Sequence, residues 1–274
     1  MAAERTTEQV RTTCCVVGGG PAGLMAGVLL ARQGVDVVVL EKHGDFLRDF
    51  RGDTLHPSTL ELMAELGWLE DVLALPHTRV ELATVSRGGE TVVVGRFDRL
   101  PVRCPFIAFL PQWDFLDLLA DAGKREPTFT LRMNTEFTGL VRNGGKVTGV
   151  RYRTPGGGTG ELAADLVIAA DGRRSLVREQ LGLPVHEFGA PMDVWWFRLP
   201  RDPGELSGAT GRFTQGQAMV LIPRGDYFQC AYLIRKGTDE LLRAEGIAAF
   251  RQRVETLVGS VAGSSEAGGG VDDV

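Results

Sequence analysis

The sequence predicts an α/β fold in which a Rossmann-like domain with a three-stranded β-meander is joined to a smaller α+β unit. Three observations carry this prediction. An apolar run ends in a Gly-rich turn at residues 18–23 and passes directly into a helical segment. Short strand-like runs between residues 128 and 164 lead into a nearly continuous apolar run at 165–170. Beyond residue 184 the sequence becomes aromatic and strand-like, which indicates a second sheet.

The Gly-rich turn has the spacing of a dinucleotide-binding fingerprint. Gly18 permits a tight turn, Gly20 lets a pyrophosphate approach the backbone, and Gly23 lets the following helix pack closely on the strand. The N-terminus of that helix then offers unpaired N–H groups to the phosphates. Such a turn is a weak signal by itself, because the chain has 36 glycines.

A second strand is predicted over residues 35–40, and Glu41 stands at its end. The separation between Gly18 and Glu41 suits a carboxylate that accepts hydrogen bonds from a ribose diol, and it disfavours a 2′-phosphate. The alternative is a structural turn with a surface glutamate. The combination of strand, turn, helix and acid favours a dinucleotide site.

The next elements are less regular. Arg51 precedes a helix that Pro57 starts. Its side chain could reach back toward a bound pyrophosphate or lie in solvent, and the spacing leaves both open. A β-hairpin is predicted at 80–94. A further helix is predicted from Trp113, with Gln112 just ahead of it.

The β-meander is predicted from runs at 134–141, 146–154 and 160–164, which Gly-containing turns separate. The apolar run 165–170 that follows suits a strand buried on both faces of a parallel sheet. It ends in Asp171-Gly172-Arg173-Arg174-Ser175, where Ser175 could cap a short helix.

The second unit is predicted from strand-like runs at 194–198, 218–222 and 227–234, followed by a helix from about Asp239. Residues 259–274 are rich in Gly and Ser, with an acidic end. This tail carries too little apolar surface to become ordered, so we expect it to be disordered.

Composition excludes several classes of function. A formal net charge of −5 without a basic cluster argues against nucleic-acid binding. Residues 1–13 lack the apolar core of a secretory signal, and no apolar run approaches membrane-spanning length. The 4 cysteines form no C-x-x-C pair and the 4 histidines are scattered, so neither a metal site nor a disulfide framework is expected. A reducing cytoplasm is the expected location.

Taken together, the pieces resemble a known family of flavoproteins. The segment Asp171-Gly172-x-x-Ser175-x-x-Arg178, placed after a β-meander and combined with the Gly-rich turn, resembles the DG motif of the FAD-dependent aromatic hydroxylases. These are the single-component flavoprotein monooxygenases typified by p-hydroxybenzoate hydroxylase. The resemblance runs from about Cys14 to about Leu257, and it implies a glutathione reductase-like FAD fold with a separate substrate domain.

The resemblance implies roles for matching positions. The glycines of the turn would cradle the FAD pyrophosphate, and Glu41 would hold the adenosine ribose. Arg51 and Gln112 resemble residues that contact FAD, and Asp171 resembles an aspartate linked to both FAD and NAD(P)H. The full set of implied cofactor-binding residues is Gly18, Gly20, Ala22, Gly23, Glu41, Lys42, Arg51, Gln112, Asp171 and Gly172.

The aromatic strand at 194–198 offers a candidate substrate pocket. Trp195 and Phe197 fall on one face of this strand and Trp196 on the other, so one set could line the pocket. The alternative is that these rings are ordinary core residues.

The chemistry that the resemblance implies belongs to the cofactor, and no catalytic side chain is assigned. NAD(P)H would reduce FAD, oxygen would add at flavin C4a, and the hydroperoxide would hydroxylate an aromatic or similar small molecule. The implied partners are this substrate, O₂, and NADPH or NADH. The oligomeric state and the choice between NADH and NADPH stay open.

The chain departs from the family in one respect. Members carry a second FAD motif, Gly-Asp, well after the substrate sheet, and no matching segment is present; Gly225-Asp226 does not fit. We therefore expect that roughly the last third of a usual member is absent. One flank of the parallel sheet would then lack a strand. FAD binding and hydroxylation would be impaired.

The domain organisation expected from these elements is discontinuous. Residues 1–78 and 100–186 would form an incomplete FAD-binding domain. Residues 79–99 and 187–258 would form the substrate-binding sheet and helix, followed by the tail at 259–274. Two other functions stay open: an FAD-dependent reductase or dehydrogenase on the same scaffold, and a non-catalytic FAD- or nucleotide-binding fragment.

Overall fold

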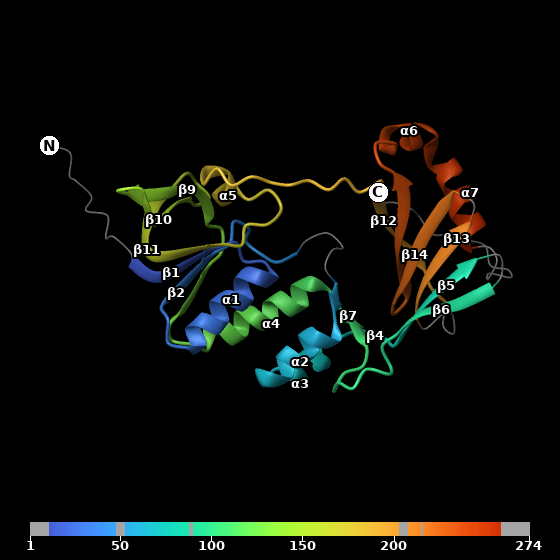
Figure 1. The fold of residues 1–274 in the computed structure, drawn as a ribbon, viewed down its shortest axis with the longest axis horizontal. Coiled ribbons are helices and arrows are strands. Elements are labelled where there is room, and N and C mark those ends of the chain that lie inside the picture. The colour runs from blue at the N-terminus through green and yellow to red at the C-terminus, as the bar shows by residue number, and fades with distance from the viewer. Residues whose placement is uncertain (1–10, 48–52, 88–89, 203–207, 215, 259–274) are drawn as a thin grey trace. The chain divides into compact units, whose positions relative to one another are not determined.

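A computed structural model describes residues 11–47, 53–87, 90–202, 208–214 and 216–258 (Figure 1). The chain divides into two compact units. Unit 1 comprises Met1–Asp49 and Gln112–His186, and unit 2 comprises Phe50–Pro111 and Glu187–Val274. The predicted tail at 259–274 lies outside the described residues.

Unit 1 is built on a six-stranded sheet with the order β8-β2-β1-β11-β10-β9. The first four of these strands run parallel, and β11, β10 and β9 form the antiparallel meander. Helices α1 and α4 lie side by side along this sheet (Figure 1). Together these elements confirm the predicted α/β fold with a β-meander. The elements of unit 1 are β1 Arg11–Val17, α1 Pro21–Arg32, β2 Val37–Leu40, α4 Gln112–Lys124, β8 Phe129–Arg132, β9 Glu136–Asn143, β10 Lys146–Arg153, β11 Thr159–Ala169 and α5 Leu176–Gln180.

Strand β11 differs from its prediction in two ways. The third meander strand and the apolar run 165–170 are one continuous strand, which pairs with β10 up to Ala163 and with β1 as far as Ala169. The run was expected to be buried on both faces, yet Leu166 is 54% exposed. The reason is that, beyond Ala163, β11 has a strand partner on one side only among the described residues.

Unit 2 contains a six-stranded sheet with the order β12-β15-β14-β13-β5-β6 and a three-stranded sheet with the order β3-β7-β4. The predicted hairpin at 80–94 is present as β5 and β6, at one edge of the larger sheet. The elements of unit 2 are β3 Thr54–Leu55, α2 Pro57–Glu65, α3 Leu69–Ala74, β4 Thr78–Val80, β5 Leu82–Arg87, β6 Glu90–Arg96, β7 Ile107–Phe109, β12 Met192–Pro200, β13 Ala209–Thr214, β14 Gln217–Arg224, β15 Tyr227–Arg235, α6 Asp239–Ala244 and α7 Gly246–Val258.

The boundaries between the units differ from the expected ones at 78/79 and 99/100. Residues 53–78 and 100–111 group with unit 2 because β3 and β4 both pair with β7. A buried ion pair adds to this grouping: Arg224 on β14 donates to Asp53 at 2.9 Å, and the guanidinium lies 5.3 Å from the centre of the Phe109 ring.

Trp195 and Phe197 are buried in the core of unit 2. Their rings meet the Phe250 ring of α7 edge-on, at centroid distances of 5.3 and 5.0 Å. This placement agrees with the alternative that they are core residues, since side chains that pack against α7 fill the space between helix and sheet.

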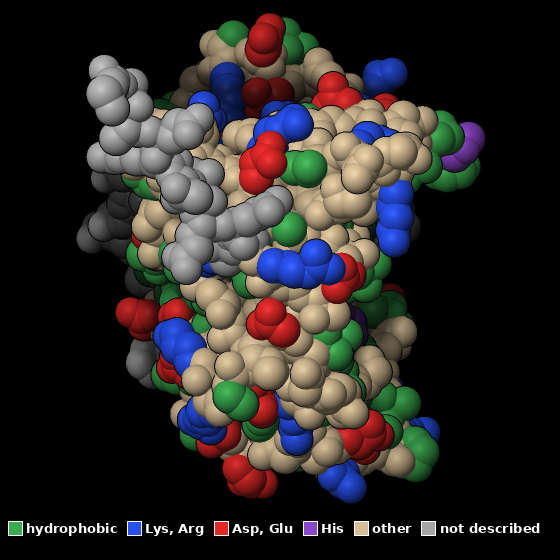
Figure 2. Space-filling model, turned by 90° about the vertical axis from the view of Figure 1, so that its left-hand side faces the viewer, with side chains coloured by type: hydrophobic (Ala, Val, Ile, Leu, Met, Phe, Trp, Pro, Cys, Tyr) green, Lys and Arg blue, Asp and Glu red, His purple; other side chains and the backbone are tan. Residues whose placement is uncertain are grey.

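Two further features concern the surface and the helices. On the face shown in Figure 2, acidic and basic side chains are interspersed. Among the described helices, none combines the length and the apolar character that crossing a membrane requires.

Gly23 in α1 leaves no room for a larger side chain, because the helix packs directly against the backbone of the Gly-rich turn. A Cβ atom on Gly23 would lie 1.8 Å from the Gly18 carbonyl oxygen, whereas one on Gly20 would have no neighbour within 4 Å. Gly23→Ala should therefore destabilise the protein by about 2–3 kcal/mol, although Ala is ordinarily the better helix former. Urea unfolding measures this change. Gly20→Ala is the matched control and should lower the unfolding midpoint much less, because alanine is a poorer N-cap than glycine but its Cβ meets no neighbour there. Equal loss in both variants would contradict the packing argument.

Candidate dinucleotide site

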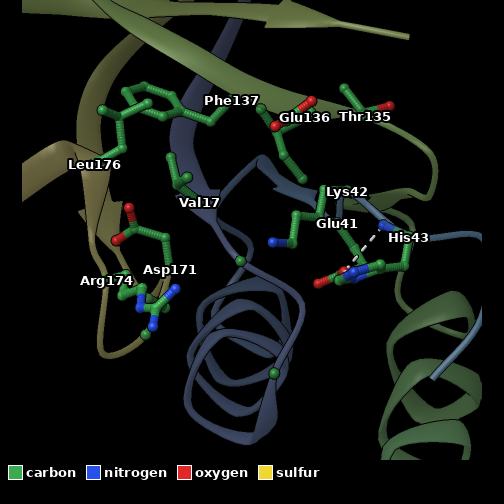
Figure 3. A pocket seen from close by; sticks show the side chains of 15 residues that line it. Val17, Glu41, Lys42, His43, Thr135, Glu136, Phe137, Asp171, Arg174 and Leu176 are labelled. Carbon is green, nitrogen blue, oxygen red and sulfur yellow. Dashed lines mark hydrogen bonds and ion pairs between the residues drawn. The ribbon is translucent and has the colours of Figure 1, made fainter. Parts of the chain in front are cut away.

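A cavity of about 400 Å³ lies in unit 1 where β1, β2 and β11 end (Figure 3). Backbone hydrogen bonds hold these three strand ends together: Gly18 donates to Leu40, and Ala170 donates to Val17, both at 2.8 Å. Figure 3 shows Glu41, Lys42 and His43 on one side of the start of α1, and Asp171 and Arg174 on the other. Parallel strands that end together before a helix N-terminus form the usual crevice for a ligand in such folds.

The Gly-rich turn forms one wall of the cavity. Gly18 has φ +107°, which L side chains rarely adopt, and a Cβ atom there would lie 2.3 Å from the Ala170 carbonyl oxygen. Gly20 stands at the N-cap of α1, where no side chain caps the helix by a hydrogen bond. Helix N–H groups without a side-chain cap make this end of α1 a site for an anion.

Glu41 faces the turn from the end of β2. Its Oε2 atom accepts a hydrogen bond from the Gly19 N–H at 2.9 Å, and its Oε1 atom accepts one from the His43 N–H at 3.0 Å. Burial opposes ionisation of this carboxyl, but hydrogen bonds from His43 and Gly19 outweigh the burial and hold the pKa of Glu41 below its usual value. Glu41 is therefore an ionised acceptor at neutral pH.

The loop after β11 is closed by its own hydrogen bonds. Asp171 accepts from the Ser175 hydroxyl at 2.6 Å and from the Val177 N–H at 3.1 Å. Ser175 in turn accepts from the Arg178 N–H at 3.0 Å, which confirms its predicted role as the N-cap of a short helix, α5. Arg178 also donates to the Arg173 carbonyl at 2.9 Å. The Asp-Gly-x-x-Ser-x-x-Arg spacing thus shapes this wall of the cavity.

Most of the residues predicted to bind the cofactor meet at this cavity. Six of them line it: Gly18, Gly20, Glu41, Lys42, Asp171 and Gly172. Gly23 is buried behind the turn, and Ala22 is exposed in the first turn of α1. Gln112, the first residue of α4, is not among the lining residues. Arg51 lies outside the described residues.

Sequence reasoning missed part of the lining. The missed residues are the strand ends Val17, Leu40 and Ala170, together with His43, Thr135, Glu136, Phe137, Arg174 and Leu176. Residues 135–137 lie at the start of β9, where the sequence contains no recognisable motif. They reach the cavity because β9 pairs within the sheet, which the sequence alone does not show. His43 and Arg174 lie within two residues of the predicted Lys42 and Gly172, so their positions in the sequence could have identified them.

The site fits a dinucleotide. Open space beside Gly20 and the N-terminus of α1 suit a pyrophosphate, and Lys42 and Arg174 add positive charge to the lining. The ionised carboxylate of Glu41 suits hydroxyl donors such as those of a ribose. Within the described ranges, no group of His, Cys, Asp or Glu side chains could hold a metal ion.

Fold and site together define a dinucleotide-binding α/β protein. The sequence matches the model of the family described as "FAD binding domain" over residues 11–273. The chain belongs to this FAD-binding family, and the residues around the cavity fit the cofactor that the family binds.

Named relatives of the chain are monooxygenases. It is 31% identical to 6-methylpretetramide 4-monooxygenase from Streptomyces rimosus over 250 residues, which are 90% of this chain and 59% of that protein. It is 33% identical to rifampicin monooxygenase from Streptomyces venezuelae over 175 residues, which are 61% of this chain and 33% of that protein. The chain thus spans between one third and three fifths of the length of these two relatives.

Solved structures confirm the fold. The p-nitrophenol 4-monooxygenase PnpA from Pseudomonas putida DLL-E4 superposes with a TM-score of 0.77 at 21% identity, covering 91% of this chain and 62% of that one. The myxobacterial chondrochloren halogenase CndH gives a TM-score of 0.75 at 19% identity, covering 90% and 58%. At these identities the likeness concerns the fold alone.

Gly20→Ala should separate cofactor binding from folding. The new methyl group finds space in the fold but stands where a pyrophosphate would approach the backbone. We expect thermal stability of the apoprotein to fall only by the small cost of replacing a glycine N-cap. FAD affinity should fall by about 10-fold or more, which corresponds to about 1.4 kcal/mol. Quenching of flavin fluorescence measures the affinity. Wild-type affinity in this variant would contradict the assigned path of the pyrophosphate.

Glu41→Gln should change how stability depends on pH. Because the pKa of Glu41 is depressed in the folded state, its contribution to stability is present above the pKa of an unfolded glutamate, about 4.3. The contribution is lost as the pH falls through the lower folded value. Chemical unfolding should show the variant less stable by about 1–2 kcal/mol at pH 7, with the difference shrinking below about pH 4. A difference that stays constant with pH would contradict this assignment.

Proposed function

We propose that the chain holds FAD in an extended form, with the adenosine end at the Gly-rich turn, as part of an FAD-dependent monooxygenase. The observation that carries the proposal is the meeting, in one cavity, of an uncapped helix N-terminus and an ionised glutamate. Membership of the FAD-binding family and the names of the relatives support it.

Different residues around the cavity would bind different parts of the cofactor. Gly20 and the start of α1 would bind the pyrophosphate, with Lys42 and Arg174 adding positive charge. Glu41 would accept hydrogen bonds from the adenosine ribose. Asp171 accepts hydrogen bonds from Ser175 and Val177, and these would keep the loop in shape beside the cofactor. Arg51 and Gln112 stay predicted FAD contacts.

The reaction proposed for the whole protein is hydroxylation of an aromatic or similar small molecule. One atom of O₂ enters a C–H bond of the substrate and the other leaves as water, with two electrons and a proton supplied by NAD(P)H and one further proton by solvent. FAD, when bound, supplies the redox chemistry. The chain's own residues bind and orient it. We also propose a cytoplasmic location, since the 4 cysteines are free and buried.

A second candidate is FAD binding without hydroxylation by this chain. It is favoured by the open edge of β11, where Leu166 is exposed and no second strand partner lies among the described residues. A reductase or dehydrogenase on the same scaffold is the third possibility. All three share the cofactor, so oxygen insertion separates them.

The test measures three quantities on the purified chain: FAD bound per polypeptide, NAD(P)H consumed, and labelled oxygen from isotopic O₂ found in product, across phenolic and polycyclic aromatic substrates. We expect bound FAD and one labelled oxygen per product molecule. NAD(P)H consumption with all oxygen recovered as hydrogen peroxide would favour a reductase. FAD binding with no NAD(P)H consumption would favour a binding role. Failure to bind FAD would overturn the proposal.

A further inference from the structure

His43 contacts the Glu41 carboxylate through both its side chain and its backbone. Its Nδ1 atom lies 2.6 Å from Glu41 Oε1, the same oxygen that accepts the His43 backbone N–H (Figure 3). An ionised carboxylate only accepts hydrogen bonds, so the Nδ1 atom carries the hydrogen. Two donors from one residue therefore converge on one carboxylate oxygen, while the Gly19 N–H holds the other.

The backbone fixes His43 independently of this contact. After β2 the chain continues along residues 132–135: Glu41 donates to the Arg132 carbonyl at 2.9 Å and accepts from the Thr135 N–H at 2.8 Å. His43 accepts from the Asn134 N–H at 2.9 Å. The main chain of both residues is therefore anchored, which fixes the points from which the imidazole and the carboxylate extend toward each other.

The carboxylate and the imidazole differ in their access to solvent. The Glu41 side chain is 10% exposed and the His43 side chain 44% exposed, and both residues line the cavity. A glutamate with three side-chain torsions would otherwise sample several orientations. Held at Oε1 by His43 and at Oε2 by Gly19, the plane of the carboxylate is set before a ligand arrives, which lowers the entropy cost of binding.

We infer that His43 is a positioning residue for FAD: it orients the Glu41 carboxylate toward the adenosine ribose diol through the Nδ1–H···Oε1 hydrogen bond. This inference rests on the proposed placement of the adenosine end at the Gly-rich turn. It assigns to His43 a role in recognising the ribose, because a ribose hydroxyl donates to a carboxylate oxygen and the hydrogen bond from His43 holds that carboxylate in place.

Three substitutions separate positioning from mere packing. An asparagine amide reaches about the position of Nδ1, whereas a glutamine amide reaches about that of Nε2. We expect His43→Ala and His43→Gln to bind FAD about 5- to 20-fold more weakly than wild type, as loss of a hydrogen bond to a charged group implies. His43→Asn should stay within about 3-fold of wild type. His186→Ala, at an exposed histidine away from the cavity, is the matched control and should bind FAD as wild type does.

The ligand supplies a second arm of the experiment. Binding of ADP and of 2′-deoxy-ADP is measured by calorimetry for wild type and His43→Ala. The loss caused by the substitution should appear with ADP and fall to about 2-fold or less with the deoxy analogue, as a double-mutant cycle between residue and hydroxyl requires. Thermal unfolding of each apoprotein checks that the variant is folded. If His43→Ala destabilises the protein, the comparison of His43→Asn with His43→Gln still tests the inference.

The outcomes distinguish this inference from the proposed function. If wild type binds neither FAD nor ADP, the proposed function fails. If wild type binds both, the inference alone fails in any of three cases: His43→Ala binds FAD as tightly as wild type or more tightly, Asn is no better than Gln, or the loss is equal for ADP and its deoxy analogue. A tighter His43→Ala would mean that the imidazole competes with the ribose.

Discussion

The close approach of backbone to backbone at the Gly-rich turn is the constraint on which unit 1 depends. Gly23 in α1 lies against the Gly18 carbonyl, and Gly18 lies against the Ala170 carbonyl at the end of β11. No side chain fits between them. This contact sets the depth at which α1 sits on the sheet, and with it the position of the helix N-terminus at the cavity.

The carboxylate of Glu41 extends this constraint across the sheet. The carboxylate accepts hydrogen bonds from Gly19 in the turn and from His43, which follows β2. The backbone of Glu41 and of His43 is hydrogen-bonded to residues 132–135. Main-chain hydrogen bonds thus set the positions of the Gly-rich turn and of Glu41 at the cavity. A site preorganised in this way holds a ligand without first ordering its own side chains.

Much of this could be read from the sequence because the signals are local. The Gly-x-Gly-x-x-Gly spacing, the acid after the second strand, the meander turns and the Ser175 cap each depend on residues close together in the chain, and each has its predicted place in the structure. Backbone conformation at a glycine and capping at a serine are decided by neighbours within a few residues.

Only the tertiary structure decided the rest, because it depends on pairing between distant segments. The pairing of β3 and β4 with β7 moved residues 53–78 to unit 2. Termination of the β10 ladder at Ala163 left Leu166 exposed where an apolar run had indicated burial. Packing against Phe250 made Trp195 a core residue, and hydrogen bonds to residues 132–135 anchored the backbone of Glu41 and His43. The sequence by itself determined the Gly-rich turn, the acid after the second strand and the serine cap, because each depends on neighbouring residues. The tertiary structure decided which other side chains line the cavity, because that depends on which strands pair.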